Sequence, residues 1–325
     1  MSMRRVSTLL LAALLGSSAC SKAPAPGAQP KVLRFGHFPN ITHVQGLVAH
    51  QLSRQGKGWF EERLGVPVEW YVYNAGPSAT EAIFTRSLDV SYIGPSPVLN
   101  AYAKSKGTEM RVLSGAANGG NSLVIRDGAG IASIADLKGK KIATPQLGST
   151  PDVQLRALLS DNGFKVKQTG GDAFILPTSN ADLLPLFQKG ELDAAWTVEP
   201  WVTRLQFEAG VKLLLEDRET NITLLTSSAA LVDHQPEFVK KLIAAHLELT
   251  QWILAHPEES KALIKAELTE LMKAAPKDEV IDQALSRIVV TEKISRESLD
   301  QMVVSARKAG FLEDIPALDR LLPQL

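Results

Sequence analysis

Short apolar segments with β-strand character alternate with amphipathic helical segments along most of this chain, and this alternation restricts its fold more than any other feature. Strands are expected at 32–38, 66–73, 89–93, 111–115, 122–126, 141–144, 173–176, 194–198 and 211–215. Helices are expected at 43–55, 78–86, 95–104, 152–162, 181–189 and 199–209. Strands separated by helices predict an α/β fold, with mostly parallel sheets and flanking helices.

The alternation occurs in two similar runs, which predicts two lobes. Residues 222–232 form one more extended segment, and 236–325 then read as nearly all helical, with breaks at Pro257, Pro276 and Pro316. A helical tail without strands of its own is expected to pack on an existing lobe. The predicted division is 32–123 plus 222–325 for lobe one, which carries the tail, and 124–221 for lobe two.

Cys20 is the only cysteine, and it follows a typical secretory signal. Arg4 and Arg5 precede an apolar run at 9–15, which is too short to span a bilayer, and small residues precede Cys20. A lone cysteine has no disulfide partner. We therefore expect a signal peptide at 1–19 and a lipidated N-terminus at Cys20, although Ser17 stands where lipoproteins usually have leucine. An ordinary secreted protein is the alternative.

A proline- and alanine-rich tether is expected at 20–31. It would join the membrane anchor to the folded part, which places the mature protein in the periplasm or at the cell surface.

Composition excludes several classes of protein. The 35 basic and 35 acidic residues balance, so nothing indicates binding to nucleic acid. The six histidines show no spacing typical of metal ligands, and no cysteine is left for a thiolate site. We expect no metal, no cofactor and no enzymatic activity, since no GxSxG motif is present either.

Six segments resemble the solute-binding proteins of ABC importers, in the branch that carries aliphatic sulfonates, taurine and nitrate. The segments are FGHFPNITH (35–43), NAGPSATEAIF (74–84), SLDVSYIGPSP (87–97), GAANGGNSLVI (115–125), IADLKGKKIATPQLGST (134–150) and KGELDAAWTVEPW (189–201). They occur in the family order over roughly residues 31 to 260. The resemblance implies the type II fold of periplasmic binding proteins, with one ligand held between two lobes, and a monomer that delivers it to permease subunits.

Three alternatives remain open beside this resemblance. A phosphonate- or phosphite-binding protein would have the same fold, and a periplasmic ligand-sensing subunit would share the site. Thiamine-pyrimidine synthases also share the bilobed fold, but they would need metal-binding cysteines, which this chain lacks.

The loops that follow the strands are the expected ligand contacts, because open α/β sheets bind ligands there. Each carries small hydrogen-bonding residues at a predicted helix start, where free backbone N–H groups attract anions. The expected contacts are Asn40, Thr42, His43, Gly76, Pro77, Ser78, Ser96, Gln146, Ser149 and Thr150. Asn118 and Asn121, near the first crossing between lobes, are expected either to contact the ligand or to form a hinge turn.

Trp196, Glu199 and Trp201 form a further cluster of expected contacts. The two rings either wall the organic tail of a sulfonate or belong to a core. Glu199 either caps a helix or faces the cleft, where it would suit the ammonium group of taurine. The binding loops are nearly free of Lys and Arg, which favours a singly charged alkanesulfonate or taurine over phosphate or sulfate.

Overall fold

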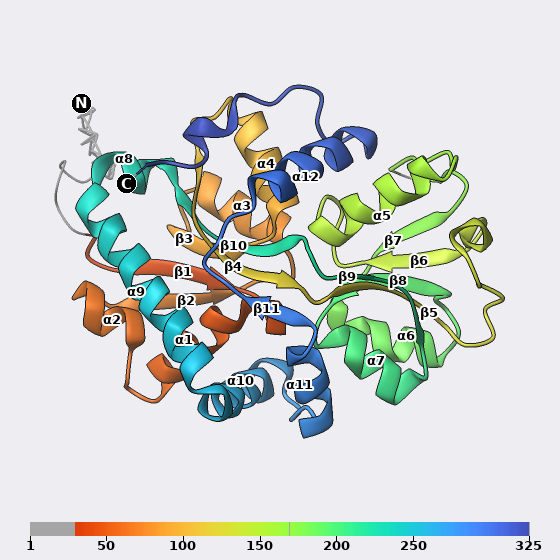
Figure 1. Ribbon diagram of the computed structural model, residues 1–325, viewed down its shortest axis with the longest axis horizontal. Helices are drawn as coiled ribbons and strands as arrows, with labels where there is room; N and C mark the ends of the chain where they lie inside the picture. The colour runs from red at the N-terminus through yellow and green to blue at the C-terminus, as the bar shows by residue number, and fades with distance from the viewer. Residues whose placement is uncertain (1–29, 169, 325) are drawn as a thin grey trace, which may run out of the picture.

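The computed structural model describes residues 30–168 and 170–324 of the 325-residue chain. Within this part, the strands form two separate sheets, each flanked by helices, which lie side by side along the long axis of the molecule (Figure 1). The two-lobed α/β architecture predicted from the sequence is confirmed.

The first sheet has six strands in the order β11-β4-β10-β3-β1-β2. They are β1 (Leu33–His37), β2 (Val68–Val72), β3 (Val90–Ile93), β4 (Met110–Gly119), β10 (Asn221–Ser228) and β11 (Ile288–Val290). β1 pairs in parallel with β2 and β3, whereas β10 is antiparallel to β3 and β4, and β11 is antiparallel to β4.

The second sheet has five strands in the order β7-β6-β8-β5-β9. They are β5 (Asn121–Ile125), β6 (Lys141–Thr144), β7 (Phe174–Pro177), β8 (Ala194–Val198) and β9 (Lys212–Asp217). β6 pairs in parallel with β7 and β8, whereas β5 is antiparallel to β8 and β9.

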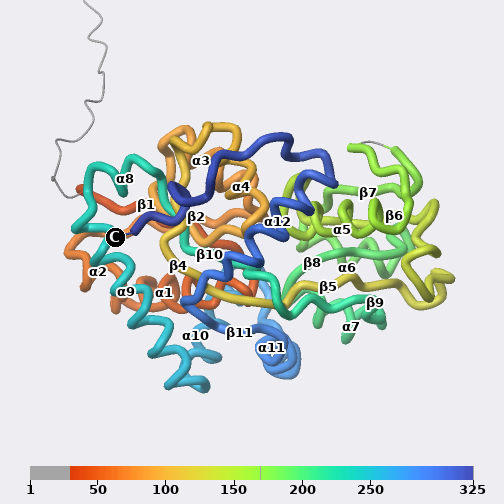
Figure 2. Tube along the Cα trace, turned by 45° about the horizontal axis from the view of Figure 1, so that its top comes forward, coloured from red at the N-terminus to blue at the C-terminus, as the bar shows by residue number. Residues whose placement is uncertain are grey.

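Both sheets are therefore mixed, rather than mostly parallel as predicted. Each sheet includes the strand that has just crossed from the other one, β5 in the second sheet and β10 in the first (Figure 2). This strand runs against its neighbours because the chain enters from the opposite side. The predicted lobe boundaries at 123/124 and 221/222 stay a prediction, and β5 runs across the first of them.

The first crossing needs glycine at two successive positions. Gly119 and Gly120 have φ angles of 73° and 68°, in the left-handed region that other residues enter at a cost of about 1–2 kcal/mol. A Cβ atom on Gly119 would also lie 2.8 Å from the carbonyl oxygen of Arg287. The crossing is thus a tight turn that packs closely against the C-terminal tail.

The helices of the two units flank the sheets. The first unit has α1 (Val44–Arg54), α2 (Trp59–Leu64), α3 (Gly76–Phe84) and α4 (Pro95–Lys104), and the second has α5 (Thr150–Asp161), α6 (Leu183–Gln188) and α7 (Trp201–Ala209). The short α2 was not expected from the sequence. Proline in the first turn helps to fix the starts of α3, α4 and α5, because its missing N–H would have no partner there.

The C-terminal tail contains α8 (Ala229–His234), α9 (Pro236–Ala255), α10 (Pro257–Met272), α11 (Asp278–Leu285) and α12 (Arg296–Lys308). Apolar residues of α9 and α10 share one core with β1 and α1, so the tail packs on the first unit as expected. α12 lies between α4 and α5, and Lys308 Nζ reaches Asp161 Oδ1 of the second unit at 2.6 Å (Figure 1).

Two expectations about the tail were wrong. The tail does contain a strand, β11, which extends the first sheet beside β4. The segment expected to be extended over 222–232 ends as a strand at Ser228, whose hydroxyl accepts a hydrogen bond from Leu231 N and caps α8.

No helix within residues 30–168 and 170–324 is both long and apolar enough to cross a bilayer.

Candidate ligand-binding site

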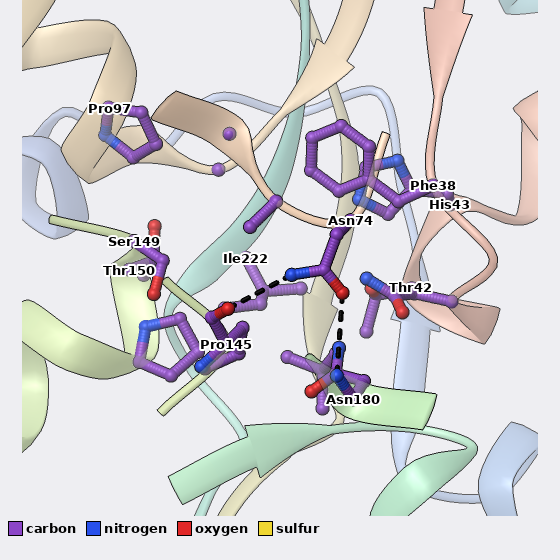
Figure 3. Close-up of a pocket in the computed structure, with 16 residues that line it drawn as sticks. Phe38, Thr42, His43, Asn74, Pro97, Pro145, Ser149, Thr150, Asn180 and Ile222 are labelled. Atoms are coloured by element: carbon purple, nitrogen blue, oxygen red, sulfur yellow. Dashed lines mark hydrogen bonds between the residues drawn. The ribbon is translucent and has the colours of Figure 1, made fainter. Parts of the chain in front are cut away.

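A cavity of about 40 Å³ lies where the two units face each other (Figure 3). A cavity needs roughly 10–15 Å³ for each water molecule, so this one has room for a small polar head group. Its walls are Phe38, Asn40, Thr42, His43, Asn74, Ala75, Gly76, Gly94, Pro97, Pro145, Ser149, Thr150, Pro151, Asn180, Val198 and Ile222.

The parallel strands of both sheets end at this cavity. Wall residues follow β1, β2 and β3 in the first unit and β6 and β7 in the second, and Val198 is the last residue of β8. The carboxyl ends of parallel strands are where open α/β sheets bind ligands. The fold therefore directs loops from both units into one space.

The cavity attracts anions without carrying a charge. Among the described residues that line it, none has a carboxylate, guanidinium or ammonium group. Burial lowers the pKa of His43 well below 6.5, with a smaller contribution from His37, so its ring is neutral at pH 7. Gly94 and Ser149 are the N-caps of α4 and α5, and α3 begins at Gly76, so three helix starts border the cavity. The partial positive charge at these helix starts favours a negative group. At α4 this charge acts without free donors, because Pro95 and Pro97 have no N–H and the Ser96 amide donates to Thr150 Oγ1.

Two wall residues have polar atoms left over for a ligand. His43 Nδ1 is buried and has no hydrogen-bond partner within the described chain. Thr42 is 1% exposed, and no hydrogen bond to its hydroxyl is found among residues 30–168 and 170–324. A buried polar group without a partner is costly, so His43 Nδ1 is placed as if to meet a bound molecule, and the Thr42 hydroxyl is available to the same molecule.

Asn74 joins the two units across the cavity (Figure 3). Its Nδ2 donates to the carbonyl oxygen of Pro145 at 2.9 Å, and its Oδ1 accepts from Asn180 N at 3.4 Å and from Ser179 Oγ at 3.3 Å.

Two further side-chain contacts join the two units. Ser78 Oγ pairs with the side chain of Gln146, and the Ser96 amide donates to Thr150 Oγ1 at 3.3 Å. The two units are thus closed upon each other in this structure.

Six of the fifteen expected contacts line the cavity: Asn40, Thr42, His43, Gly76, Ser149 and Thr150. Ser78, Gln146 and Ser96 lie in the contacts between the units rather than on the cavity wall. Pro77 lines a separate groove with Thr80 and Leu147.

Of the two positions expected for the tryptophan rings, the structure favours the core. Trp196 lies in the core of the second unit, and its Nε1 donates to Asn121 Oδ1. Trp201 packs with Val198 and Ile222, and its Nε1 donates to Asn40 Oδ1 at 2.8 Å. Each ring holds a neighbouring residue in place and stays outside the cavity.

Of the two roles expected for Glu199, the structure favours the helix cap over the cleft. Its carboxylate is fully buried and accepts hydrogen bonds from Thr203 N at 3.0 Å and from Arg287 at 2.8 Å. It therefore caps the first turn of α7 and pairs with the tail. Desolvation raises the pKa of Glu199, and the hydrogen bonds from Arg287 and Thr203 oppose this rise.

Asn118 and Asn121 belong to the crossing rather than to the cavity. Asn118 Oδ1 accepts from Asn221 Nδ2, which joins the outgoing chain to the returning chain. Asn121 Nδ2 donates to Gln154 at 2.9 Å and to Asp217 at 3.1 Å. Of the two roles expected for this pair, the structure favours the hinge turn.

Sequence reasoning missed several wall residues. Phe38, Pro97, Pro145, Val198 and Ile222 supply the apolar side of the cavity. Asn180 follows β7 in the same way as Asn40 follows β1, so the strand-end rule could have found it.

Comparison with known proteins agrees with this architecture. The profile of the NMT1-like family matches residues 27–268. A Bacillus subtilis (strain 168) protein named for binding aliphatic sulfonates is 25% identical over 98% of this chain and 92% of its own length. The taurine-binding periplasmic protein of Escherichia coli (strain K12) is 24% identical over 66% of this chain and 68% of its own.

A solved structure shows the same fold. The alkanesulfonate-binding protein SsuA from Xanthomonas axonopodis pv. citri, bound to MOPS, superimposes with a TM-score of 0.69 at 21% identity, over 92% of this chain and 96% of that one. The resemblance to the sulfonate and taurine branch is confirmed. Because the family profile spans well over half of the chain, this protein belongs to the NMT1-like family.

Proposed function

We propose that this chain is the extracytoplasmic solute-binding component of an ABC importer. It captures a small, singly charged oxyanion, such as an aliphatic sulfonate, taurine or nitrate, between its two units and delivers it to a permease. The observation that carries this proposal is a cavity at the strand ends of both sheets, bordered by three helix starts and free of charged side chains. The names of its relatives point to the same class of ligand.

The donor set favours one negative charge over two. Neutral hydroxyl, amide and imidazole groups can hold a sulfonate or nitrate, whereas phosphate usually recruits an arginine fork. The apolar wall formed by Phe38, Pro97, Val198 and Ile222 suits a short organic group on the anion. No carboxylate of the described cavity wall is available for an ammonium group, so taurine gains nothing over ethanesulfonate.

Binding rather than catalysis fits the hydroxyl groups of the wall. Ser149 Oγ accepts from Asp152 N at 3.4 Å as a helix cap, and Thr150 Oγ1 accepts from Ser96 N. Neither hydroxyl hydrogen-bonds to His43 within the described chain, so no paired nucleophile and base is formed.

A thermal-shift screen tests the proposal. Methanesulfonate, ethanesulfonate, taurine, nitrate, methylphosphonate, phosphite, sulfate and phosphate are each added to the purified protein. A ligand at 100 times its Kd stabilises the folded state by about 2.7 kcal/mol. The proposal expects a sulfonate or nitrate to give the largest shift. If a phosphonate or phosphite gives the largest shift, the ligand class changes and the importer role stands. If none of the anions shifts the melting temperature, the proposal is contradicted.

Replacing Thr42 with valine should weaken binding of the best ligand. The two side chains have nearly the same shape, so Thr42→Val removes the cavity hydroxyl and little else. The loss of one hydrogen bond should cost about 0.5–3 kcal/mol, between about twofold and just over a hundredfold in Kd by calorimetry. Thr226→Val is the matched control, because Thr226 is buried and bonds Ser91 O within the sheet. Equal Kd values for the parent and Thr42→Val would place the site elsewhere.

Cys20 lies outside the described residues, and its lipidation remains a prediction. The free thiol and amine that follow cleavage can carry more than one acyl chain, which anchors a protein stably. Intact-mass spectrometry of the protein from a native-type host should therefore find acyl mass on a chain that begins at Cys20. An unmodified chain with another N-terminus would contradict the anchor while leaving the binding function untouched. We further propose that the anchored protein works as a monomer.

A further inference from the structure

Three side chains that can ligate a metal meet in the core of the first unit, away from the cavity wall. His37 ends β1, His50 lies in α1, and Glu267 lies in α10 of the tail. His37 and Glu267 are fully buried, and His50 is 7% exposed. One ligand atom from each of them lies within 4.8 Å of the other two.

Short contacts join these three groups through His50 Nδ1. His50 Nδ1 lies 2.7 Å from Glu267 Oε1 and 2.8 Å from His37 Nε2. His37 Nδ1 donates to the carbonyl oxygen of Phe38 at 3.3 Å, which leaves a lone pair on Nε2. The proton on His50 Nδ1 therefore faces two acceptors, and it can satisfy only one of them fully.

The charges suit a divalent cation. Burial lowers the pKa of His37 to about 3, with a further contribution from His50, so His37 is neutral and free to ligate at pH 7. Burial raises the pKa of Glu267, but hydrogen bonds from His50 and Arg54 outweigh this effect and lower it. Glu267 therefore brings a negative charge into the core beside His37 and His50.

We propose that His37 Nε2, His50 Nδ1 and Glu267 Oε1 form a binding site for a divalent transition metal ion of the Zn²⁺ type. The ion displaces the proton from His50 Nδ1, and that proton moves to Nε2 of the same ring or, where Nε2 already carries one, to solvent. Two imidazoles and one carboxylate make a three-ligand set that suits Zn²⁺, with a water molecule as the fourth ligand. The ion would tie β1 and α1 to the tail helix α10.

The surroundings of the site hold its ligands in the right orientation. Arg54 Nε donates to Glu267 Oε2 at 2.8 Å, which fixes the carboxylate, and the Phe38 carbonyl fixes the tautomer of His37. The ring of Trp70 stacks on His50 with centroids 5.1 Å apart. Ligand atoms around a tetrahedral Zn²⁺ lie about 3.3 Å apart. The distances from His50 Nδ1 to Glu267 Oε1 and to His37 Nε2 therefore need to increase by roughly half an ångström when the ion binds.

No such cluster was expected from the sequence, because positions 37, 50 and 267 have no ligand spacing. Only the packing of the tail on the first unit brings Glu267 to the histidines.

Zinc binding by the purified protein tests the site directly. After dialysis against Zn²⁺ and removal of excess metal, elemental analysis should find one zinc per chain, and added Zn²⁺ should raise the Tm where Mg²⁺ does not. X-ray absorption at the zinc edge should show two imidazole ligands. His50→Gln should weaken Zn²⁺ binding at least about a hundredfold, since even changes to groups behind the ligands cost 10- to 100-fold.

His256→Gln is the control for adventitious zinc on the surface, because His256 is exposed and stacks on Trp252. This variant should bind zinc as the parent does. If His50→Gln fails to fold, the X-ray absorption spectrum of the zinc-loaded parent protein still tests the proposal. Absence of bound zinc, a spectrum without two imidazoles, or zinc lost with His256 instead of His50 would each overturn the proposal.

Discussion

Replacing Glu199 with glutamine should lower the free energy of unfolding by about 3–5 kcal/mol, the cost of breaking a buried ion pair. The Glu199 carboxylate is fully buried, and its partner Arg287 is only 9% exposed. Without the Glu199 charge, the carboxylate that remains near Arg287 is that of Glu216, whose Oε1 lies 3.6 Å from Arg287 Nε. A buried guanidinium without a close partner is strongly destabilising, whatever the net value of the intact pair.

The position of Glu199 adds to this effect. Its backbone N donates to Gly120 O at the crossing, and its carbonyl oxygen accepts from Ile41 N of the first unit, both at 2.8 Å. Its side chain holds Thr203 in α7 and Arg287 in the tail. Glu199 is therefore the residue at which both units, the crossing and the tail meet.

Chemical denaturation measures the loss. Glu208→Gln is the matched control, because Glu208 pairs with Arg204 on the surface of α7, and such pairs contribute about 0.3–0.5 kcal/mol. The double variant Glu199→Gln/Arg287→Gln should cost less than the sum of its single variants. A loss below about 1 kcal/mol in Glu199→Gln would show that the pair does not hold the units together.

Acidification should destabilise the protein through His246, which is fully buried between α9 and the first sheet. Its Nε2 lies 2.9 Å from Gly115 O, and its Nδ1 lies 3.0 Å from the Tyr92 hydroxyl. Desolvation lowers the pKa of His246 from 6.5 to about 4. The unfolded chain thus takes up this proton first as the pH falls.

The stability from His246 is complete above about pH 6.5 and is lost as the pH falls toward 4. A shift of this size corresponds to about 3 kcal/mol. The free energy of unfolding should therefore fall between pH 7 and pH 4 by about 3 kcal/mol more in the parent than in His246→Gln. Exposed His256 serves as the control, since His256→Gln should retain the steep dependence of the parent. Parallel curves for the parent and His246→Gln would contradict the expected titration.

Much of the fold could be predicted because its signals are local. β6 and β8 occupy the predicted ranges 141–144 and 194–198, and α4 occupies 95–104, where Pro95 fixes the start. β11 could not be predicted, since three residues become a strand only when β4 offers them a free edge. The direction of β5 and β10 likewise depends on how the chain crosses between sheets.

The candidate site was predicted in part for a related reason. The strand-end rule located Thr42, His43, Ser149 and Thr150 on the cavity wall, because it needs only the order of elements. It could not tell which way a ring points. β8 is buried along its whole length. No alternation of buried and exposed residues therefore shows on which face of the sheet the Trp196 ring packs.

Competition calorimetry at one ionic strength tests the central claim most directly, since unequal screening would distort the comparison of anions. The claim is that a cavity of neutral donors between the two units selects a singly charged oxyanion and accepts a short organic group on it. Ethanesulfonate should bind more tightly than sulfate and phosphate, and taurine should bind no more tightly than ethanesulfonate. Tighter binding of phosphate or sulfate would contradict the claim.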